Sequence, residues 1–420
     1  MDSSPDAGAL LLREPRASEI SAPHANPGDV HRNIRPRLLW IDASRGLVML
    51  MVILLHISGY EYLPDTAGYS SVAVNSWNEV NNLLAAARMP ALFVISGWLA
   101  STSISEGFGF SRTRKRILTN AWLLVLWTGI YAAVTVVLKG QDTPNTVTPS
   151  TVLVNLLLPN STLWFLAALV WYTVLLTALR RVPKLVVLAG LLALSAYTIT
   201  YWSTVSGLWV KLPQFGLFFA LGVYGKTVFS AVARHAVLAM PIGLACAVLG
   251  IHWQSYQSEH QEWGYPSFLL IAISLPIFLY ALCSIATSMA PRLCSPLTAI
   301  GRNTVALYVL HFPVLLALIH IGPVHQLLLV VLRHELGRWL WPLVYTVAFT
   351  VFALAVKKRL DDSRFAWLLG LPRGLARWID APSVVPEPER IRVPAAPAQA
   401  RFPVTASRSR PRREDLELVS

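Results

Sequence analysis

Long apolar segments recur along this chain of 420 residues, and they constrain its fold more than any other feature. A helix rises about 1.5 Å per residue, so roughly 20 apolar residues are needed to cross the hydrocarbon core of a bilayer. Ten such segments follow one another, at residues 39–58, 83–101, 119–138, 163–179, 185–202, 213–229, 236–253, 265–288, 303–321 and 340–356. The sequence therefore predicts an all-α fold, a polytopic integral membrane bundle of about ten transmembrane helices.

The overall composition points to the same class of protein. Hydrophobic residues make up 55% of the chain, charged residues make up 14%, and the mean hydropathy is +0.52. Soluble globular chains and disordered chains both carry more charge and less apolar side chain than this, so both classes are excluded. The net charge of +13 would favour a nucleic-acid partner in a soluble protein, but here it must first be considered as a sign of topology.

The basic residues gather on one side of the predicted bundle. Both termini and the alternate loops hold 29 of the 35 Lys and Arg residues against 14 acidic residues, whereas the remaining loops hold 4 basic and 7 acidic residues. Cytoplasmic loops of membrane proteins are rich in Lys and Arg. We therefore expect both termini in the cytoplasm of a multi-pass protein of the inner (plasma) membrane, with the lipid bilayer and not nucleic acid as its partner.

Four regions follow from composition along the chain. Residues 1–37 are polar and proline-rich and predict a disordered cytoplasmic arm, and residues 38–358 hold the ten apolar segments. Residues 359–380 combine basic and aromatic side chains, which is typical of a juxtamembrane segment at the lipid interface. Residues 381–420 are rich in Pro and Arg without periodicity, which predicts a disordered cytoplasmic tail.

Charged side chains inside spanning helices are costly in lipid, so they mark functional candidates. The first apolar segment contains Asp42 and Arg45 near its start and His56 near its end. Eleven residues separate Arg45 from His56, which is about three helical turns and a climb of roughly 16 Å, so the two side chains share one helix face. Asp42 lies three residues before Arg45, where it can pair with the guanidinium. The plainer alternative is that Asp42 and Arg45 are interfacial anchors and that His56 is a snorkelling residue at the helix end.

Further polar residues lie in three other apolar segments. Arg88 lies more than a helical turn inside the second segment, and Trp164 and Phe165 open the fourth. In the ninth, Arg302 and Asn303 mark a start where free backbone N–H groups suit an anion, and His311 follows near mid-membrane. A hydrogen bond to a neighbouring helix is the structural alternative for His311, and an ordinary aromatic belt is the alternative for Trp164 and Phe165.

Together these motifs resemble the acyltransferase 3 family of polytopic membrane acyltransferases. The resemblance covers about residues 36–358 and rests on four motifs in order, Asp42-Ala43-Ser44-Arg45-Gly46 with His56 completing Arg-x10-His, Arg88-Met89-Pro90 through Ser96-Gly97-Trp98, Leu163-Trp164-Phe165-Leu166, and Ile300-Gly301-Arg302-Asn303 through Leu307-Tyr308-Val309-Leu310-His311. It implies transfer of an acyl group, often acetyl from acyl-CoA, to a hydroxyl of a sugar or another glycoconjugate. It also implies that His56 and Arg45 are essential.

The motifs suggest which residues bind the acyl donor and which act on the acceptor. We expect acyl-CoA, with acetyl-CoA as the first candidate, to enter from the cytoplasmic side, where basic loops and Arg302 meet its phosphates. His56 acts in this hypothesis as general base on the acceptor hydroxyl, and Arg45, oriented by Asp42, holds the donor. Arg88 stabilises the developing oxyanion or holds the sugar. The cysteines Cys246, Cys283 and Cys294 lack metal-ligand spacing, so no metal is expected.

Two other functions remain open from the sequence. A transporter of a glycolipid or small anion would also place ionisable residues inside the bundle, although no matched pair of broken helices indicates an inverted repeat. A membrane scaffold without chemistry would tolerate replacement of Arg45 and His56. No residue pattern chooses the acceptor among cell-wall polysaccharide, lipid-linked sugar, glycolipid and secondary metabolite.

Overall fold

The computed structural model describes residues 38–138, 147–158, 160–202, 210–259 and 264–380. The predictions for the 1–37 arm and the 381–420 tail lie outside these residues. Throughout the described ranges every regular element is a helix, and no strand occurs. The predicted all-α class is confirmed.

Eight helical segments are long and apolar enough to cross a membrane. They are the continuous run Leu39–Thr66, made of α1 (Leu39–Ile57), a π-helical turn (Ser58–Tyr62) and α2 (Leu63–Thr66), then α3 (Val72–Glu106), α4 (Ser111–Val137), α6 (Trp164–Ala178) with its extension to Arg181, α7 (Lys184–Tyr201), α10 (Ala236–Glu259), α11 (Tyr265–Met289) and α15 (Glu335–Asp361). Two sharply bent pairs also qualify when each is counted as one span, α8 (Lys211–Tyr224) with α9 (Lys226–Arg234) at 73°, and α12 (Ser295–Arg302) with α13 (Thr304–His320) at 78°. The expected polytopic bundle of about ten spans is thus confirmed.

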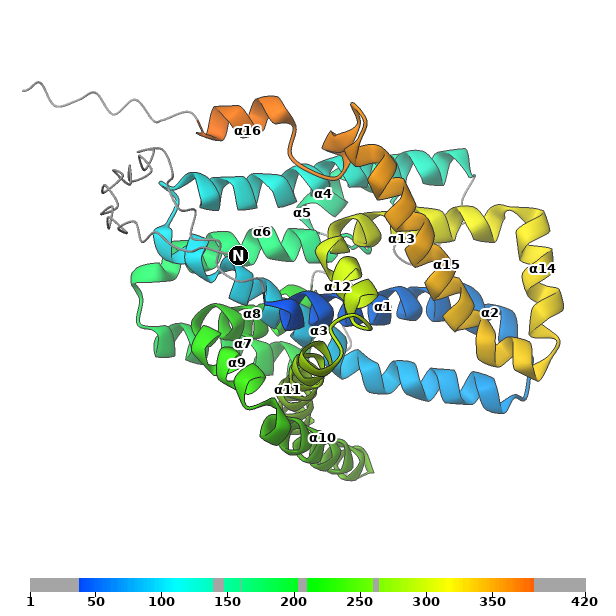
Figure 1. The fold of residues 1–420 in the computed structure, drawn as a ribbon, viewed down its shortest axis with the longest axis horizontal. Coiled ribbons are helices and arrows are strands. Elements are labelled where there is room, and N and C mark those ends of the chain that lie inside the picture. Colours follow the sequence, from blue (N-terminus) through cyan, green and yellow to red (C-terminus); the bar gives the residue numbers. More distant parts are fainter. Residues whose placement is uncertain (1–37, 139–146, 159, 203–209, 260–263, 381–420) are drawn as a thin grey trace, which may run out of the picture.

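Three departures from the predicted helices have local causes. α3 starts eleven residues before the apolar window, because Ser71 caps it by accepting a hydrogen bond from the Val74 N–H, and polar residues continue the helix beyond the apolar part. The predicted sixth segment, residues 213–229, is broken at Gly225 between α8 and α9, whereas α13 begins directly after Asn303, where the predicted ninth segment begins. α14 (Gly322–Leu332) is a further short apolar helix that connects α13 to α15 across one end of the bundle (Figure 1).

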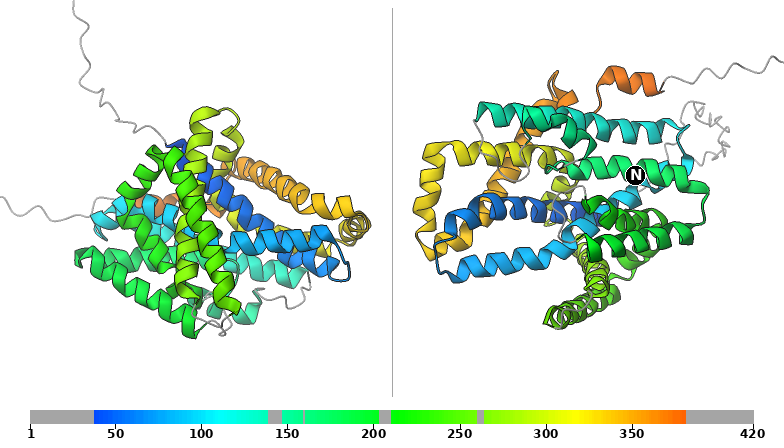
Figure 2. Two further views of the ribbon diagram at one scale, coloured as in Figure 1. Left: turned by 90° about the horizontal axis from the view of Figure 1, so that it is seen from below. Right: turned by 180° about the vertical axis from the view of Figure 1, so that it is seen from behind.

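Two further groups of helices complete the bundle. α11 packs against α1 and α3, and α10 packs on α11, so that the pair projects at one edge of the bundle (Figures 1 and 2). After α15, the last short helix, α16 (Arg373–Asp380), lies along α4, where Lys115 pairs with Asp380 at 2.5 Å. The indole of Trp127 donates to the Leu368 carbonyl at 2.8 Å, so the segment is held to α4 at two places. A short helix, α5 (Val152–Leu157), lies between α4 and α6.

Glycines bring α1 and α12 into backbone contact. A Cβ on Gly301 would lie 1.7 Å from the Asp42 carbonyl oxygen, and a Cβ on Gly46 would lie 2.2 Å from the Leu297 carbonyl oxygen. No larger residue fits at either position without moving a helix, since real Cβ atoms do not approach backbone atoms so closely. The glycines of the first and fourth sequence motifs therefore join these two helices.

A second glycine pair joins α3 to α8 in the same manner. A Cβ on Gly97 would meet the Phe219 carbonyl oxygen at 2.0 Å, and a Cβ on Gly222 would meet the Val94 carbonyl oxygen at 2.0 Å. Small residues let membrane helices approach this closely and gain dispersion contacts along their length. The Ser96-Gly97 pair of the second motif thus serves packing, and it fixes α8 beside the helix that carries Arg88.

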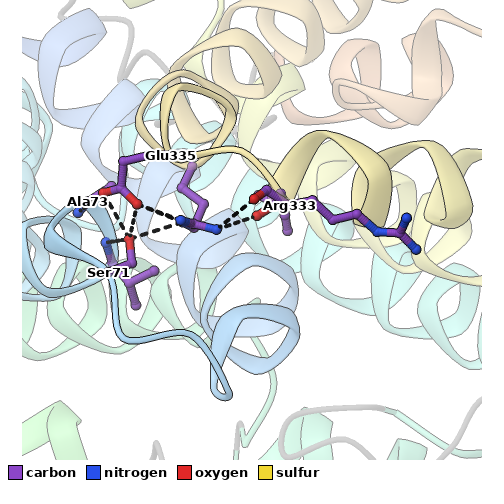
Figure 3. Close-up of polar contacts among 7 residues, drawn as sticks. Ser71, Ala73, Arg333 and Glu335 are labelled. Atoms are coloured by element: carbon purple, nitrogen blue, oxygen red, sulfur yellow. Dashed lines mark hydrogen bonds and ion pairs between the residues drawn. The ribbon is translucent and has the colours of Figure 1, made fainter.

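At the end of the bundle near α14, hydrogen bonds join an ion pair within α15 to the start of α3 (Figure 3). The Glu335 carboxylate accepts hydrogen bonds from the Ala73 N–H at 2.9 Å and from the Ser71 hydroxyl, where the positive end of the α3 dipole favours it. Arg338 reaches Glu335 Oε2 at 2.6 Å, and it also donates to the Ser71 hydroxyl and to the Leu332 carbonyl at 2.8 Å. One buried guanidinium therefore joins α3, α14 and α15.

Replacing Arg338 with alanine is expected to lower the melting temperature by several degrees, because the Leu332 carbonyl and the Ser71 hydroxyl lose their donor in a buried place. A thermal-unfolding scan of the purified protein measures the effect. Arg333→Ala is the matched control, because the Arg333 side chain is exposed and points away from the cluster, and only its carbonyl takes part (Figure 3). Equal melting temperatures for the two variants would contradict this role.

Candidate active site

One stripe of α1 lines two chambers inside the bundle. Arg45 and Met49 line the first, and Val52 and His56 line the second. These positions are spaced by four, three and four residues, which keeps them on one helix face. The structure thus places Arg45 and His56 on a common face but in different chambers, which agrees with the roughly 16 Å between them along the helix.

The chamber around Arg45, called the Arg45 chamber below, is strongly basic. Its volume is about 450 Å³, and four of its lining residues are cationic, whereas none of those in the described part of the chain is acidic. The cations are Arg45, Arg112, Lys115 and Arg116. Thr304 and Val305, in the first turn of α13, complete one wall, and a helix N-terminus favours an anionic group.

Contacts with neighbouring helices position two of these cations. The Arg45 guanidinium donates to the Thr304 hydroxyl of α13 at 2.6 Å. Arg116 donates from α4 to the carbonyls of Ser96 at 3.0 Å and Leu99 at 3.2 Å, both on α3. These hydrogen bonds between helices determine where the two guanidinium groups lie on the chamber wall.

The other two cations take part in ion pairs that are open to solvent. Arg112 pairs with Glu106 at the end of α3, and Lys115 pairs with Asp380 of α16 at 2.5 Å. Exposed ion pairs contribute little to stability, about 1 kcal/mol or less. A phosphate carries more charge than one carboxylate, so it can compete for these two side chains.

The second chamber, called the His56 chamber, has a volume of about 680 Å³ and a different character. Aromatic rings dominate its walls, and its only ionisable residues in the described ranges, apart from tyrosines, are His56, Arg88 and Lys211. The aromatic lining residues are Tyr60, Trp164, Phe165, Phe215 and Tyr308. Such a chamber suits a ligand with both apolar faces and polar groups.

The hydrogen bond of His56 determines which ring nitrogen is free. Its Nδ1 lies 2.8 Å from the Val52 carbonyl oxygen, which can only accept, so Nδ1 carries the proton and donates it. In the neutral ring Nε2 then keeps its lone pair. The ring also stacks on Tyr60 at a centroid distance of 5.9 Å and an interplanar angle of 5°. The tautomer therefore leaves Nε2 with a lone pair that can accept a proton.

His311 contacts His56 and lines neither chamber. The two rings are 4.7 Å apart between centroids. The Nδ1 of His311 donates to the Tyr308 carbonyl of its own helix, and its Nε2 is buried without a hydrogen-bond partner in the described residues. The structure therefore places His311 beside the predicted base, where it supports the His56 ring, and its contact with a substrate stays a prediction.

The two chambers meet at a shared wall. Leu92, Phe165 and Tyr308 line both of them. Tyr308 donates its hydroxyl proton to the Thr162 carbonyl and accepts from the Phe165 N–H at 3.2 Å, so it holds the start of α6 in place. Trp164 thus lines the His56 chamber alone, and Phe165 lies in the wall that the two chambers share.

Arg302 and Asn303 occupy other places than the motif alone suggests. Arg302 Nε lies 3.3 Å from Asp42 Oδ2, and Asn303 donates to the Ala299 carbonyl at 2.8 Å. Neither residue lines either of the two chambers. The Asp42–Arg302 pair instead adds a second link between α1 and α12, because the Gly301 contact brings their backbones together.

The sequence did not single out several lining residues. Arg112, Lys115 and Arg116 entered there only as part of the basic cytoplasmic loops expected to meet the phosphates of acyl-CoA, and Lys211 was counted as a loop charge of the opposite side. The Lys211 Nζ lies 6.0 Å from the centre of the Trp164 ring. No local signal identifies it, because Trp164 is 47 positions away and Arg88 is 123 positions away.

A many-helix membrane bundle with a positioned histidine and a basic chamber fits a membrane enzyme, and the comparisons with known proteins identify its family. The model of the acyltransferase domain matches residues 38–358, so the chain belongs to the acyltransferase 3 family and is an acyltransferase. The chain is also similar to Inner membrane protein YcfT of Escherichia coli strain K12, with 25% identity over 375 residues, which cover 81% of this chain and 98% of YcfT. No solved structure matches the chain.

Proposed function

We propose that the protein is an O-acyltransferase of the inner membrane that transfers an acyl group, with acetyl as the first candidate, from acyl-CoA to a hydroxyl of a sugar, glycolipid or cell-envelope glycan. The observation that carries this proposal is the pair of chambers that meet at the wall of Leu92, Phe165 and Tyr308. One chamber has four cations for a phosphorylated donor, and the other has a histidine for a hydroxyl acceptor. The similarity to YcfT, an inner membrane protein by name, supports the location.

The Arg45 chamber suits the donor by charge. Coenzyme A carries several phosphate charges on one end and its thioester on a long, thin arm. Phosphate groups bind arginine and lysine through charge-assisted hydrogen bonds, and the basic lining of this chamber offers several. The excess of Lys and Arg in the loops beside this chamber favours the cytoplasmic side, where acyl-CoA is made. The thioester would then lie at the shared wall.

The chemistry in this proposal takes place at the His56 side of the wall. His56 Nε2 accepts the proton of the acceptor hydroxyl while the hydroxyl oxygen forms a bond to the thioester carbonyl carbon. The carbon–sulfur bond then breaks with its electron pair on sulfur, and the coenzyme A thiolate takes up the proton from the imidazolium. The products are the O-acylated acceptor and free coenzyme A. His311, packed against His56, would keep the ring in place during this exchange.

Arg45→Ala is expected to raise the KM for acyl-CoA by roughly 10-fold to 100-fold with a smaller effect on kcat, because charge-assisted hydrogen bonds to the donor are lost. Release of free thiol from acetyl-CoA by the purified protein, with the acceptor supplied, measures both constants. Arg234→Ala is the matched control, because Arg234 is an exposed residue of α9 that lines neither chamber. An unchanged KM in Arg45→Ala would show that Arg45 does not bind the donor. If the unmodified protein releases no thiol from acetyl-CoA, a transporter would be favoured instead.

A further inference from the structure

The charges in the His56 chamber point to the chemical class of the acceptor. In the described residues its charged lining groups other than His56 are two cations, Arg88 and Lys211, and no carboxylate lines it. Neither cation forms an ion pair with a described residue. An uncharged sugar offers no counter-charge to such a pair, whereas an anionic one does.

Arg88 is a fixed and buried positive charge. Its side chain is 3% exposed, and its guanidinium donates to Asn81 Oδ1 at 3.3 Å, the Asn81 carbonyl at 3.0 Å and the Met51 carbonyl at 3.5 Å. All three acceptors are neutral oxygens. A charge removed from water and held only by dipoles remains uncompensated, and this is costly unless a ligand supplies the opposite charge.

Lys211 adds a second, accessible charge on the open side of the same chamber. It is exposed to solvent at the start of α8, and its ammonium lies near the Trp164 ring. Arg88 and Lys211 are close enough to act on each other electrostatically, and both act on His56. Two like charges in one chamber repel, so an anion between them would relieve the repulsion.

The two acidic residues nearest to His56 in sequence do not line the chamber. Asp65 lies 3.7 Å from His325 of α14, and Glu61, which is 3% exposed, lies close to Trp341 and Tyr345 of α15. Both carboxylates thus lie against α14 or α15. The positive charge of the chamber is therefore not balanced by the acids nearest to it in sequence.

We propose that the acceptor is an anionic glycoconjugate, whose oxyanion, a phosphate or a carboxylate, is held by Arg88 and Lys211 while its sugar packs on Trp164 and presents a hydroxyl to His56. This inference rests on the proposed acyltransferase function and deepens it. Arg88 is then a binding residue for the acceptor, and its charge also selects against neutral sugars. Lys211, as a charge at the start of α8, attracts the anion to the chamber.

Direct binding measurements test this inference without depending on turnover. Three probes share one alkyl chain and one glucose-type ring: a neutral alkyl glucoside, the matching alkyl glucuronide with a carboxylate, and an alkyl phosphodiester of glucose. We expect calorimetric titration of the full-length protein in nanodiscs to give at least one anionic probe about tenfold tighter binding than the glucoside. The stronger of the two anionic probes identifies the source of the charge.

Variants then test whether Arg88 and Lys211 themselves bind the anion, and not the positive charge of the protein as a whole. Lys211→Gln and Arg88→Gln are each expected to reduce the ratio of affinities for the anionic probe and the neutral glucoside several-fold. Arg88→Lys, which keeps the charge, should retain part of the preference. Arg333→Gln is the control, because Arg333 is an exposed cation away from the chamber. Lys211 is exposed, so its variant remains informative if Arg88→Gln fails to fold.

Two outcomes overturn the inference, and they differ from failure of the proposed function. Equal binding of the three probes to the unmodified protein would show that the chamber does not select an anion. An anion preference that persists in both Lys211→Gln and Arg88→Gln would place the anion elsewhere. Acyl transfer to the neutral glucoside as fast as to the anionic probes would leave the acyltransferase proposal intact and remove this one alone.

Discussion

Replacement of His56 with phenylalanine is expected to reduce the rate of acyl transfer by roughly 10²-fold to 10⁴-fold, the usual contribution of a general base. Phenylalanine keeps a ring against Tyr60 and His311, so packing is retained while the nitrogen that accepts the proton is removed. The KM for acyl-CoA should change little, because His56 lines only the chamber assigned to the acceptor. Steady-state thiol release with purified protein measures both effects.

A matched histidine variant separates chemistry from general damage to the protein. His252 is an exposed residue of α10 and lines neither chamber, so His252→Phe should retain full activity. Melting temperatures of the two variants should both stay near that of the unmodified protein. If His56→Phe turns over at the normal rate with an intact fold, His56 is not the base and the proposed mechanism is wrong.

Gly301→Ala is expected to lower the stability of the bundle by at least about 2 kcal/mol, because the new Cβ would lie 1.7 Å from the Asp42 carbonyl oxygen. That oxygen belongs to the backbone and not to a flexible side chain, so α12 must move away from α1. The movement also separates Asp42 from Arg302 and Arg45 from Thr304, so donor binding should weaken as well. Thermal unfolding and the KM for acyl-CoA measure the two consequences.

The control for this variant is a glycine in an open place. A Cβ on Gly190 of α7 meets nothing within 4 Å, so Gly190→Ala should be neutral or slightly stabilising, since alanine favours helix by about 1 kcal/mol over glycine. Equal melting temperatures for Gly301→Ala and Gly190→Ala would show that α1 and α12 adjust without cost. The close contact would then have no role in stability.

Most membrane helices could be predicted from the sequence because hydropathy is a sum over neighbouring residues. The apolar segment at residues 39–58 can be found without tertiary information. The segment at residues 303–321 likewise matches α13, although the bend between α12 and α13 could not be predicted. The extent of α3 could not be predicted in this way. Its first turns mix apolar and polar residues and depend on the Ser71 cap and on Glu335, a residue more than 260 positions away.

The candidate site could be predicted only in part. Arg45 and His56 were found because both lie on one helix, where spacing alone determines the face. The partner that Arg302 provides for Asp42 depends on two glycines that bring separate helices together. The positions of Lys211 beside Trp164 and of Tyr308 at the shared wall likewise depend on how α6, α8 and α13 pack.

The sequence by itself determined that this chain is a helical membrane protein and that Arg45 and His56 share a face, because apolar length, charge distribution and helical spacing are local properties. The resemblance to the acyltransferase 3 family was also present in the sequence, in four motifs taken in order. The tertiary structure decided that Arg45 and His56 line different chambers, that Arg302 pairs with Asp42 outside both chambers, and that Arg88 and Lys211 give the His56 chamber its positive charge. These features arise from contacts between distant helices, such as the close approach of α1 and α12 at Gly301.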